Sequence, residues 1–187
     1  MQNLTEQAHE LFRTALQPGD IAIDATAGNG HDTLFLAQQV GSTGIVFAFD
    51  LQAVAIAKTA RRLKQAEIQN VTLFQEDHSR LQQSIPNEHH GQVAAIMFNL
   101  GYLPGSDKTM VTDLNSTIVA IEQSLELLRS GGLLTVLAYT GHPGGKEETD
   151  AVGQLLTGLS ADQYTVNLIT ADEKRLSPPQ LFVVQKV

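Results

Sequence analysis

Apolar residues along the chain occur either in short continuous runs or at intervals of three and four residues. Short runs predict buried strands, and the wider spacing predicts amphipathic helices. The predicted strands cover 21–23, 45–49, 71–74, 93–98, 133–138, 164–169 and 180–186. The predicted helices cover 5–16, 33–37, 53–65, 111–129 and a segment from the glycines at 144–145 to about 159. Strands that alternate with helices predict an α/β fold, and we expect one domain over residues 1–187.

The first strand leads into a glycine turn and then a helix. Asp24 ends the strand, Gly28 and Gly30 lie in the turn, and the helical pattern follows. This arrangement brings backbone against a nucleotide-like ligand. The third glycine of the dinucleotide fingerprint is absent, and a carboxylate at Asp24 would repel a pyrophosphate but suits a cationic ligand. A plain glycine turn in another α/β protein is the alternative.

Two further carboxylates follow the next two predicted strands. Asp50 ends the second strand, where a carboxylate accepts hydrogen bonds from two ribose hydroxyls. NAD enzymes use the same placement, so Asp50 supports an adenosine ligand without choosing between cofactors. Asp77 follows the third strand. Three strand-end carboxylates in this order resemble the arrangement found in class I methyltransferases.

Composition narrows the function classes further. The 187 residues carry a formal net charge of −8 and no cysteine, which excludes disulfides and cysteine-ligated metal centres. An acidic chain argues against broad nucleic-acid binding but allows a local basic patch. Lys58, Arg61, Arg62 and Lys64 form the most basic segment, which we interpret as a solvated helix face. With no apolar run long enough for a membrane span, we expect a cytoplasmic protein without membrane association.

Several turns carry residues that could bind a metal or take part in a reaction. His89 and His90 are adjacent, offer only two ligands and have no nearby carboxylate set, so we expect exposed loop histidines and no metal site. The glycines at 131–132 are expected to end the long helix. Asn99 follows the fourth strand at the crevice where the strand order of such sheets reverses. An ordinary turn is the alternative for Asn99.

Asn99, Tyr102 and Pro104 resemble a variant of the Asn/Asp-Pro-Pro-Tyr motif of methyltransferases that act on exocyclic amines. The two residues after Asn99 are Leu and Gly in place of the two prolines, and the aromatic residue comes one position later. The turn after Asp24 similarly resembles motif I of class I S-adenosylmethionine-dependent methyltransferases. In that class the acidic residue approaches the methionine end of the cofactor.

These motifs, together with Tyr139-Thr-Gly-His-Pro-Gly-Gly, resemble the YtqB/MnmM group of small methyltransferases, once labelled putative rRNA methylases. The resemblance covers nearly the whole chain. It implies a Rossmann-like class I methyltransferase fold, a seven-stranded, mostly parallel sheet of order 3-2-1-4-5-7-6 with helices on both faces. It also implies that S-adenosylmethionine is the cofactor and that the anticodon loop of tRNA is the partner, with a homodimer as an alternative to a monomer. The implied reaction converts the 5-aminomethyl group of (2-thio)uridine at the wobble position to 5-methylaminomethyl.

The same resemblance assigns roles to residues. The expected cofactor-binding residues are Asp24, Thr26, Gly28, Asn29, Gly30, His31, Asp32, Asp50, Gln52, Asp77, His78 and Asn99. The expected substrate-binding residues are Leu100, Tyr102, Pro104, Lys108, His142, Gly144 and Lys146. The expected catalytic residues are Asn99, Tyr102 and His142, although His142 could equally stabilise its turn. The rival functions are a small-molecule amine methyltransferase on the same fold and a non-catalytic nucleotide- or NAD-binding α/β domain.

Overall fold

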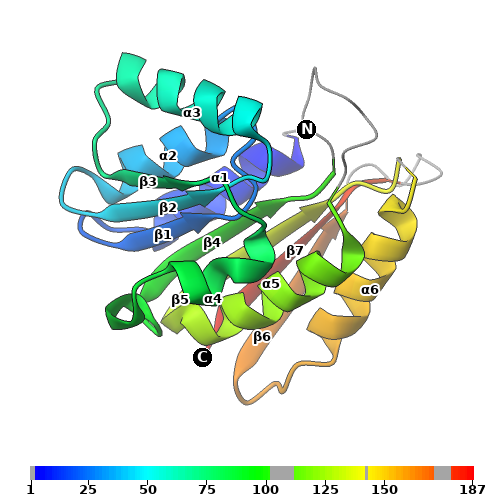
Figure 1. Cartoon of the computed structure of the whole chain (residues 1–187). Coiled ribbons are helices and arrows are strands. Elements are labelled where there is room, and N and C mark those ends of the chain that lie inside the picture. Colours follow the sequence, from blue (N-terminus) through cyan, green and yellow to red (C-terminus); the bar gives the residue numbers. More distant parts are fainter. Residues whose placement is uncertain (1–2, 102–111, 142, 171–177) are drawn as a thin grey trace.

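The computed structural model describes residues 3–101, 112–141, 143–170 and 178–187, which form a central sheet between two layers of helices (Figure 1). The strands are β1 (Ile21–Asp24), β2 (Ile45–Phe49), β3 (Val71–Phe74), β4 (Val93–Asn99), β5 (Leu128–Ala138), β6 (Tyr164–Thr170) and β7 (Gln180–Lys186). The α-helices are α1 (Leu4–Ala15), α2 (His31–Val40), α3 (Ala53–Gln65), α4 (Leu81–Ser84), α5 (Leu114–Leu127) and α6 (Gly145–Thr157). Two short 3₁₀ turns, η1 (His78–Arg80) and η2 (Asn87–His89), flank α4.

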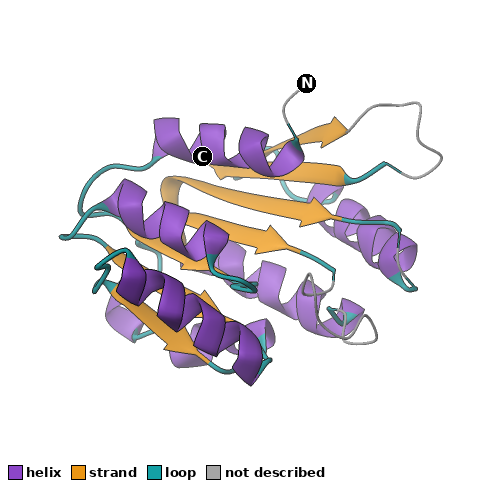
Figure 2. Ribbon diagram, turned by 90° about the horizontal axis from the view of Figure 1, so that it is seen from above, coloured by secondary structure: helices purple, strands orange, loops and turns teal. Residues whose placement is uncertain are grey.

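The sheet has the predicted order, β3-β2-β1-β4-β5-β7-β6. Strands β1 to β5 pair in parallel, and β7 pairs antiparallel with both β5 and β6. The parallel strands lie side by side between the helical layers (Figure 2), which explains their continuous apolar sequences. In β4, every residue from Val93 to Phe98 is buried. The predicted fold class is therefore confirmed.

The two faces of the sheet carry separate cores. On one face, α1 and α2 cover alternate strand residues such as Ala22, Val46 and Met97. On the other, α5 and α6 cover residues such as Ile23, Phe47 and Phe98. Figure 1 shows α1, α2 and α3 on one side of the sheet and α4, α5 and α6 on the other. None of the helices in the described ranges is long and apolar enough to cross a membrane.

The strand order reverses between β1 and β4, which are neighbours in the sheet but lie far apart in the sequence. Asp24 of β1 pairs with Met97 of β4, and Asn99 ends β4 two residues later. Ligands of open α/β sheets bind beyond the carboxyl ends of the strands at such a reversal. The fold thus places Asp24 and Asn99 at the position where a ligand is expected.

The end of the long helix differs from the prediction. Helix α5 stops at Leu127, Leu128 is extended, and the segment containing Gly131 and Gly132 belongs to β5. The reason is tertiary: Leu128 is buried and pairs with Val93. The Lys186 ammonium donates to the carbonyls of Leu125 and Leu128, so the helix end is satisfied without a glycine cap.

The adjacent histidines also differ from the prediction of exposed loop residues. Both are half-buried. His90 Nε2 lies 3.0 Å from the Ile85 carbonyl oxygen, and the His89 ring lies 5.6 Å from the ring of Phe47. These contacts hold the turn before β4 against the sheet. Over the described residues, no group of three or more histidine and acidic side chains is arranged to hold a metal ion.

Candidate active site

The turn between β1 and α2 depends on glycine at Gly30. Its φ of +76° lies in the left-handed region, and a Cβ there would lie 2.8 Å from the Cα of Thr59. Helix α3 therefore packs directly against the turn. Gly30 also precedes α2 without a side-chain cap, so the first N–H groups of α2 are left for another acceptor. A ligand carboxylate is the type of group that fits there.

Asp24 is fully buried at the end of β1. It accepts hydrogen bonds from the Thr33 hydroxyl at 2.6 Å and from the Thr26 backbone N–H at 3.1 Å. Burial first, and then the negative charge of Asp32, raise the pKa of Asp24 to about 7, although these two hydrogen bonds act to lower it. A buried carboxylate with a raised pKa is typical of functional sites, where a cation can offset its cost.

We expect Asp24→Asn to stabilise the apo-protein at pH 8 more than at pH 5. The pKa of Asp24 is about 7 in the folded state, compared with its ordinary value of 3.8. Between these two pH values the folded state therefore binds more protons than the unfolded state. Wild-type stability is therefore lost as pH rises through this window, and asparagine removes that loss. The change in unfolding free energy, measured by denaturant titration, should differ between the two pH values by a few kcal/mol. A pH-independent difference would contradict this cause.

Asp50 and Asp77 lie at the ends of β2 and β3. Asp50 accepts the backbone N–H of Gly28 at 2.9 Å and that of Gln52 at 2.8 Å, which fixes the carboxylate beside the glycine turn. Asp77 accepts the Ser79 backbone N–H at 2.8 Å. Burial raises the pKa of Asp77, but the hydrogen bonds from Ser79, the charge of His78 and a hydrogen bond from Ser116 together lower it overall. Each carboxylate oxygen can accept more than one hydrogen bond.

His78 is buried directly behind the turn. Its Nδ1 lies 3.3 Å from the Ala25 carbonyl oxygen, and its Nε2 lies 3.3 Å from the Ser116 hydroxyl. Burial lowers the pKa of His78, although the nearby charge of Asp77 opposes this. The contacts of His78 connect α5 to the turn after β1.

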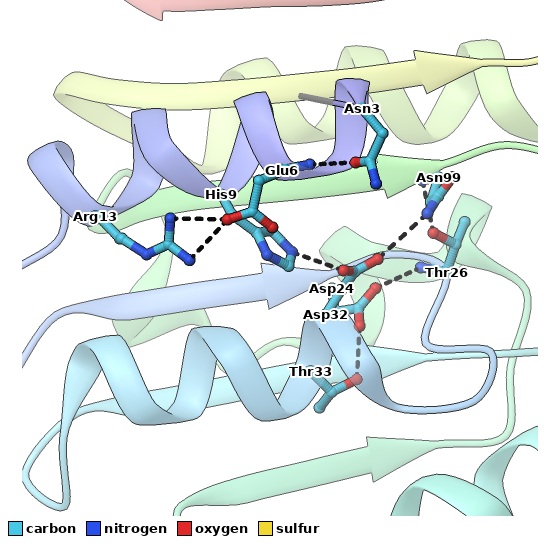
Figure 3. Close-up of polar contacts among 9 residues, drawn as sticks. All are labelled: Asn3, Glu6, His9, Arg13, Asp24, Thr26, Asp32, Thr33 and Asn99. Atoms are coloured by element: carbon cyan, nitrogen blue, oxygen red, sulfur yellow. Dashed lines mark hydrogen bonds and ion pairs between the residues drawn. The ribbon is translucent and has the colours of Figure 1, made fainter. Parts of the chain in front are cut away.

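Asn99 is held by two side chains from separate segments of the chain (Figure 3). Its backbone N–H donates to the Thr26 hydroxyl at 2.8 Å, and its side-chain Nδ2 donates to Asp32 at 3.3 Å. The other oxygen of Asp32 lies 2.8 Å from Nε2 of His9 in α1. The His9 ring is stacked on Phe35, with 3.9 Å between ring centroids. Because Nδ2 faces Asp32, the Oδ1 atom of Asn99 is left as the acceptor.

Two members of this polar group were not predicted from the sequence. His9 is one residue after Ala8 on the buried side of α1, and Tyr139 follows β5. Burial raises the pKa of Tyr139, a hydrogen bond with Thr5 lowers it, and the charge of Asp32 raises it. A histidine beside the apolar stripe of an amphipathic helix was the available signal for His9.

The backbone after Asn99 is fixed by a buried carboxylate. Leu100 is buried, and the Gly101 N–H donates to the Thr112 hydroxyl at 3.2 Å. That hydroxyl donates to Glu148 at 2.8 Å, and the Thr117 hydroxyl donates to the other oxygen of Glu148 at 2.7 Å. Glu148 is only 3% exposed. Helix α6 thereby holds the peptide that contains the Leu100 carbonyl.

His31 and Asn29 contact α3. The Arg62 guanidinium donates to the Asn29 carbonyl at 2.8 Å and to Nε2 of His31 at 2.9 Å. An arginine can only donate, so this His31 nitrogen is the acceptor. His31 is exposed at the start of α2. Arg62 was predicted to lie on a solvated face, but its guanidinium instead clamps the glycine turn.

The remaining predicted residues lie apart from this group or outside the described residues. Gly144 has a φ of +80° immediately before α6. Lys146 is exposed and forms an ion pair with Asp150 one turn later. Tyr102, Pro104, Lys108 and His142 lie outside the residues that the structure describes.

The donor set at this edge fits S-adenosylmethionine. A buried carboxylate with a raised pKa suits a cation, and Asp50 suits a ribose diol. The N–H groups at the start of α2 suit the carboxylate of the amino-acid moiety. The same combination would not suit a pyrophosphate, because Asp24 would repel it.

Comparison with known proteins identifies relatives that are described as RNA methyltransferases. A family model described as "Putative rRNA methylase" matches residues 46–185. The chloroplastic tRNA (mnm(5)s(2)U34)-methyltransferase of Arabidopsis thaliana is 36% identical over 97% of this chain and 69% of its own length. A crystal structure described as a "putative rRNA-methylase" from Clostridium thermocellum is 37% identical, with a TM-score of 0.94 and coverage of 100% of this chain and 99% of the other.

A second solved structure bears on the cofactor. A methyltransferase from Streptococcus mutans in complex with SAH is 34% identical, with a TM-score of 0.89 and coverage of 100% and 99%. The family model matches most of the chain, and the two solved structures share its complete fold. The chain therefore belongs to this rRNA methylase family, whose solved members have the class I methyltransferase fold.

Proposed function

We propose that this S-adenosylmethionine-dependent methyltransferase acts on tRNA and methylates the 5-aminomethyl group of (2-thio)uridine at the wobble position. The Arabidopsis relative, named for a wobble-uridine reaction, supports this substrate. The observation that carries the proposal is the orientation of Asn99. Its amide N–H faces Asp32, so its oxygen is left to accept an N–H from a substrate amine.

The chemistry requires a neutral, aligned amine. When bound, S-adenosylmethionine supplies a methyl group on an activated sulfonium, so the protein aligns the reactants and excludes water. An ammonium has no lone pair, so the substrate must lose a proton before it attacks. The Asn99 side-chain oxygen and the Leu100 carbonyl would accept the N–H bonds of the amine. A neutral asparagine avoids the stabilisation of the ammonium that a carboxylate would provide.

Hydrogen bonds from neighbouring residues orient both acceptors. Asp32 and Thr26 fix Asn99, while Thr112 and Glu148 orient the peptide after Leu100. Preorganised acceptors need no rearrangement when the methyl group is transferred. This geometry favours attack by an amine over attack by a hydroxyl or carbon, since two acceptors match two N–H bonds.

The cofactor would lie across the glycine turn. Asp24 and the start of α2 would hold its amino-acid moiety, Asp50 its ribose and Asp77 its adenine. We expect Asp50→Ala to weaken binding of S-adenosylhomocysteine by about 1.5–3 kcal/mol, because a charged acceptor is lost. Isothermal titration calorimetry measures this. Unchanged affinity in a folded Asp50→Ala variant would remove Asp50 from the cofactor site.

The choice of RNA can be tested by label transfer. The enzyme is incubated with S-adenosylmethionine labelled in its methyl group, together with tRNA that carries 5-aminomethyl-uridine or with ribosomal RNA. We expect label in the tRNA alone. Label in ribosomal RNA alone would overturn the proposed substrate, and label in neither, from protein that binds S-adenosylhomocysteine, would point to a small amine.

A further inference from the structure

Helix α3 carries an unusual concentration of positive charge for an acidic protein. Lys58, Arg61, Arg62 and Lys64 account for four of the twelve basic residues, and α3 contains no acidic residue. Lys58, Arg61 and Lys64 are exposed, whereas Thr59 and Leu63 are buried against the body of the protein. The three exposed residues are spaced at intervals of three, so they form one stripe along the outer side of the helix. We call Lys58, Arg61 and Lys64 the α3 stripe.

The α3 stripe differs from the other lysines and arginines of the described residues, each of which has a carboxylate, carbonyl or histidine partner there. Arg13, Arg80, Arg129 and Lys146 form ion pairs with acidic side chains. Lys186 donates to two carbonyls, and Arg62 donates to Asn29 and His31. Within the described ranges, no acidic side chain lies within ion-pair distance of Lys58, Arg61 or Lys64, and Glu67 is the first acidic residue after them. These three charges are therefore available to an external anion.

The helix that carries the α3 stripe packs against the glycine turn of the candidate active site. Arg62 clamps the glycine turn, and the absence of a Cβ at Gly30 lets Thr59 approach it closely. A macromolecule that contacts α3 therefore contacts the element that packs on the cofactor turn. Exposed cations without internal partners gain more from a phosphate backbone than cations already paired, because no ion pair has to be broken.

We propose that the α3 stripe is a docking surface for the phosphate backbone of the substrate tRNA. This inference rests on the proposed function, since it takes tRNA as the occupant. The stripe supplies affinity and register without reading bases, as phosphate contacts do. It also explains how a chain of net charge −8 binds a polyanion: the positive charge is concentrated on one helix.

The test combines three substitutions, Lys58→Gln, Arg61→Gln and Lys64→Gln. Glutamine has nearly the same helix propensity as lysine and arginine, so α3 should remain folded. Binding of unmodified tRNA is measured by fluorescence anisotropy between 50 and 200 mM salt. Loss of three phosphate contacts should lower the slope of log affinity against log salt by about 2 to 3. Because the salt concentration changes fourfold, the loss of affinity at 50 mM should exceed that at 200 mM by about 16- to 64-fold.

A matched control separates local from overall charge. Gln154→Glu, Gln163→Glu and Asn167→Asp together lower the net charge by three, as the α3 substitutions do, but at exposed positions on or beside α6 and β6. Strand β6 forms the opposite edge of the sheet from β3. We expect this variant to keep most of the wild-type salt slope. Both variants should bind S-adenosylhomocysteine with wild-type affinity, which confirms that they are folded.

Each outcome decides the inference. An equal loss of slope in the two triple variants would mean that overall charge, and not the α3 stripe, governs binding. An unchanged slope in the α3 variant would also overturn the inference, even if the wild-type enzyme methylates tRNA. A selective loss of slope without any methylation of tRNA by the wild type would instead refute the proposed function and leave the docking surface in place.

Discussion

Replacing Asn99 with alanine is expected to lower kcat by on the order of 100-fold, because a misaligned amine attacks poorly. The substitution removes the side-chain acceptor and its bond to Asp32, but it keeps the backbone N–H that donates to Thr26. If Asn99 orients the amine only as the methyl group is transferred, affinity for S-adenosylhomocysteine should stay near the wild-type value. Single-turnover kinetics and calorimetry measure the two quantities separately.

The outcome has two informative alternatives. Near wild-type turnover in Asn99→Ala would refute the catalytic role of this residue. A large loss of cofactor affinity would place Asn99 in the cofactor pocket instead. Thr26→Val provides a matched comparison, since it removes only the hydroxyl that accepts the Asn99 backbone N–H and retains the side-chain amide.

The second large effect is expected at Asp32. Its two oxygens contact His9 and Asn99, so it connects α1 to the end of β4. Asp32→Ala should lower kcat by about 10- to 100-fold, because the side-chain amide of Asn99 can then rotate out of its orientation. Asp32→Asn should retain more activity, since its amide oxygen can still accept from Asn99 Nδ2.

The role of Asp32 as a positioning residue is tested by the split between kcat and KM. A positioning defect lowers kcat with little change in KM for S-adenosylmethionine. His9→Phe is the matched control: it can retain the stack on Phe35 and leaves the Asp32–Asn99 contact intact, so its effect should be smaller. A loss as large in His9→Phe as in Asp32→Ala would mean that the folding of α1 decides activity. Equal activity in Asp32→Ala and Asp32→Asn would show that the acceptor oxygen is not needed.

Much of the fold could be predicted because it follows from local patterns. Continuous apolar runs such as 93–98 occur in strands that are buried on both faces, and period-four spacing occurs in the helices. The positions of Asp24, Asp50 and Asp77 also follow from the pattern, because parallel strands end at one edge of the sheet. The glycine-containing turn between β1 and α2 could also be predicted from the sequence.

The parts that could not be predicted depend on contacts between distant segments. His9 reaches Asp32, which is 23 residues away in the sequence, only because α1 packs beside α2. The early end of α5 is set by the pairing of Leu128 with Val93 of β4 and by the hydrogen bonds from Lys186 of β7. The clamp by Arg62 depends on how α3 packs on the turn. Residue spacing within one helix carries no information on such partners.

The central claim is most directly tested by mass spectrometry of wobble nucleosides. Transfer RNA that contains 5-aminomethyl-2-thiouridine is incubated with the enzyme and S-adenosylmethionine, digested to nucleosides and compared with a reaction that contains Asn99→Ala. The account predicts that the 5-aminomethyl nucleoside disappears and that 5-methylaminomethyl-2-thiouridine forms in its place, much more slowly with the variant. An unchanged 5-aminomethyl nucleoside after prolonged incubation with enzyme that binds S-adenosylhomocysteine would contradict the account.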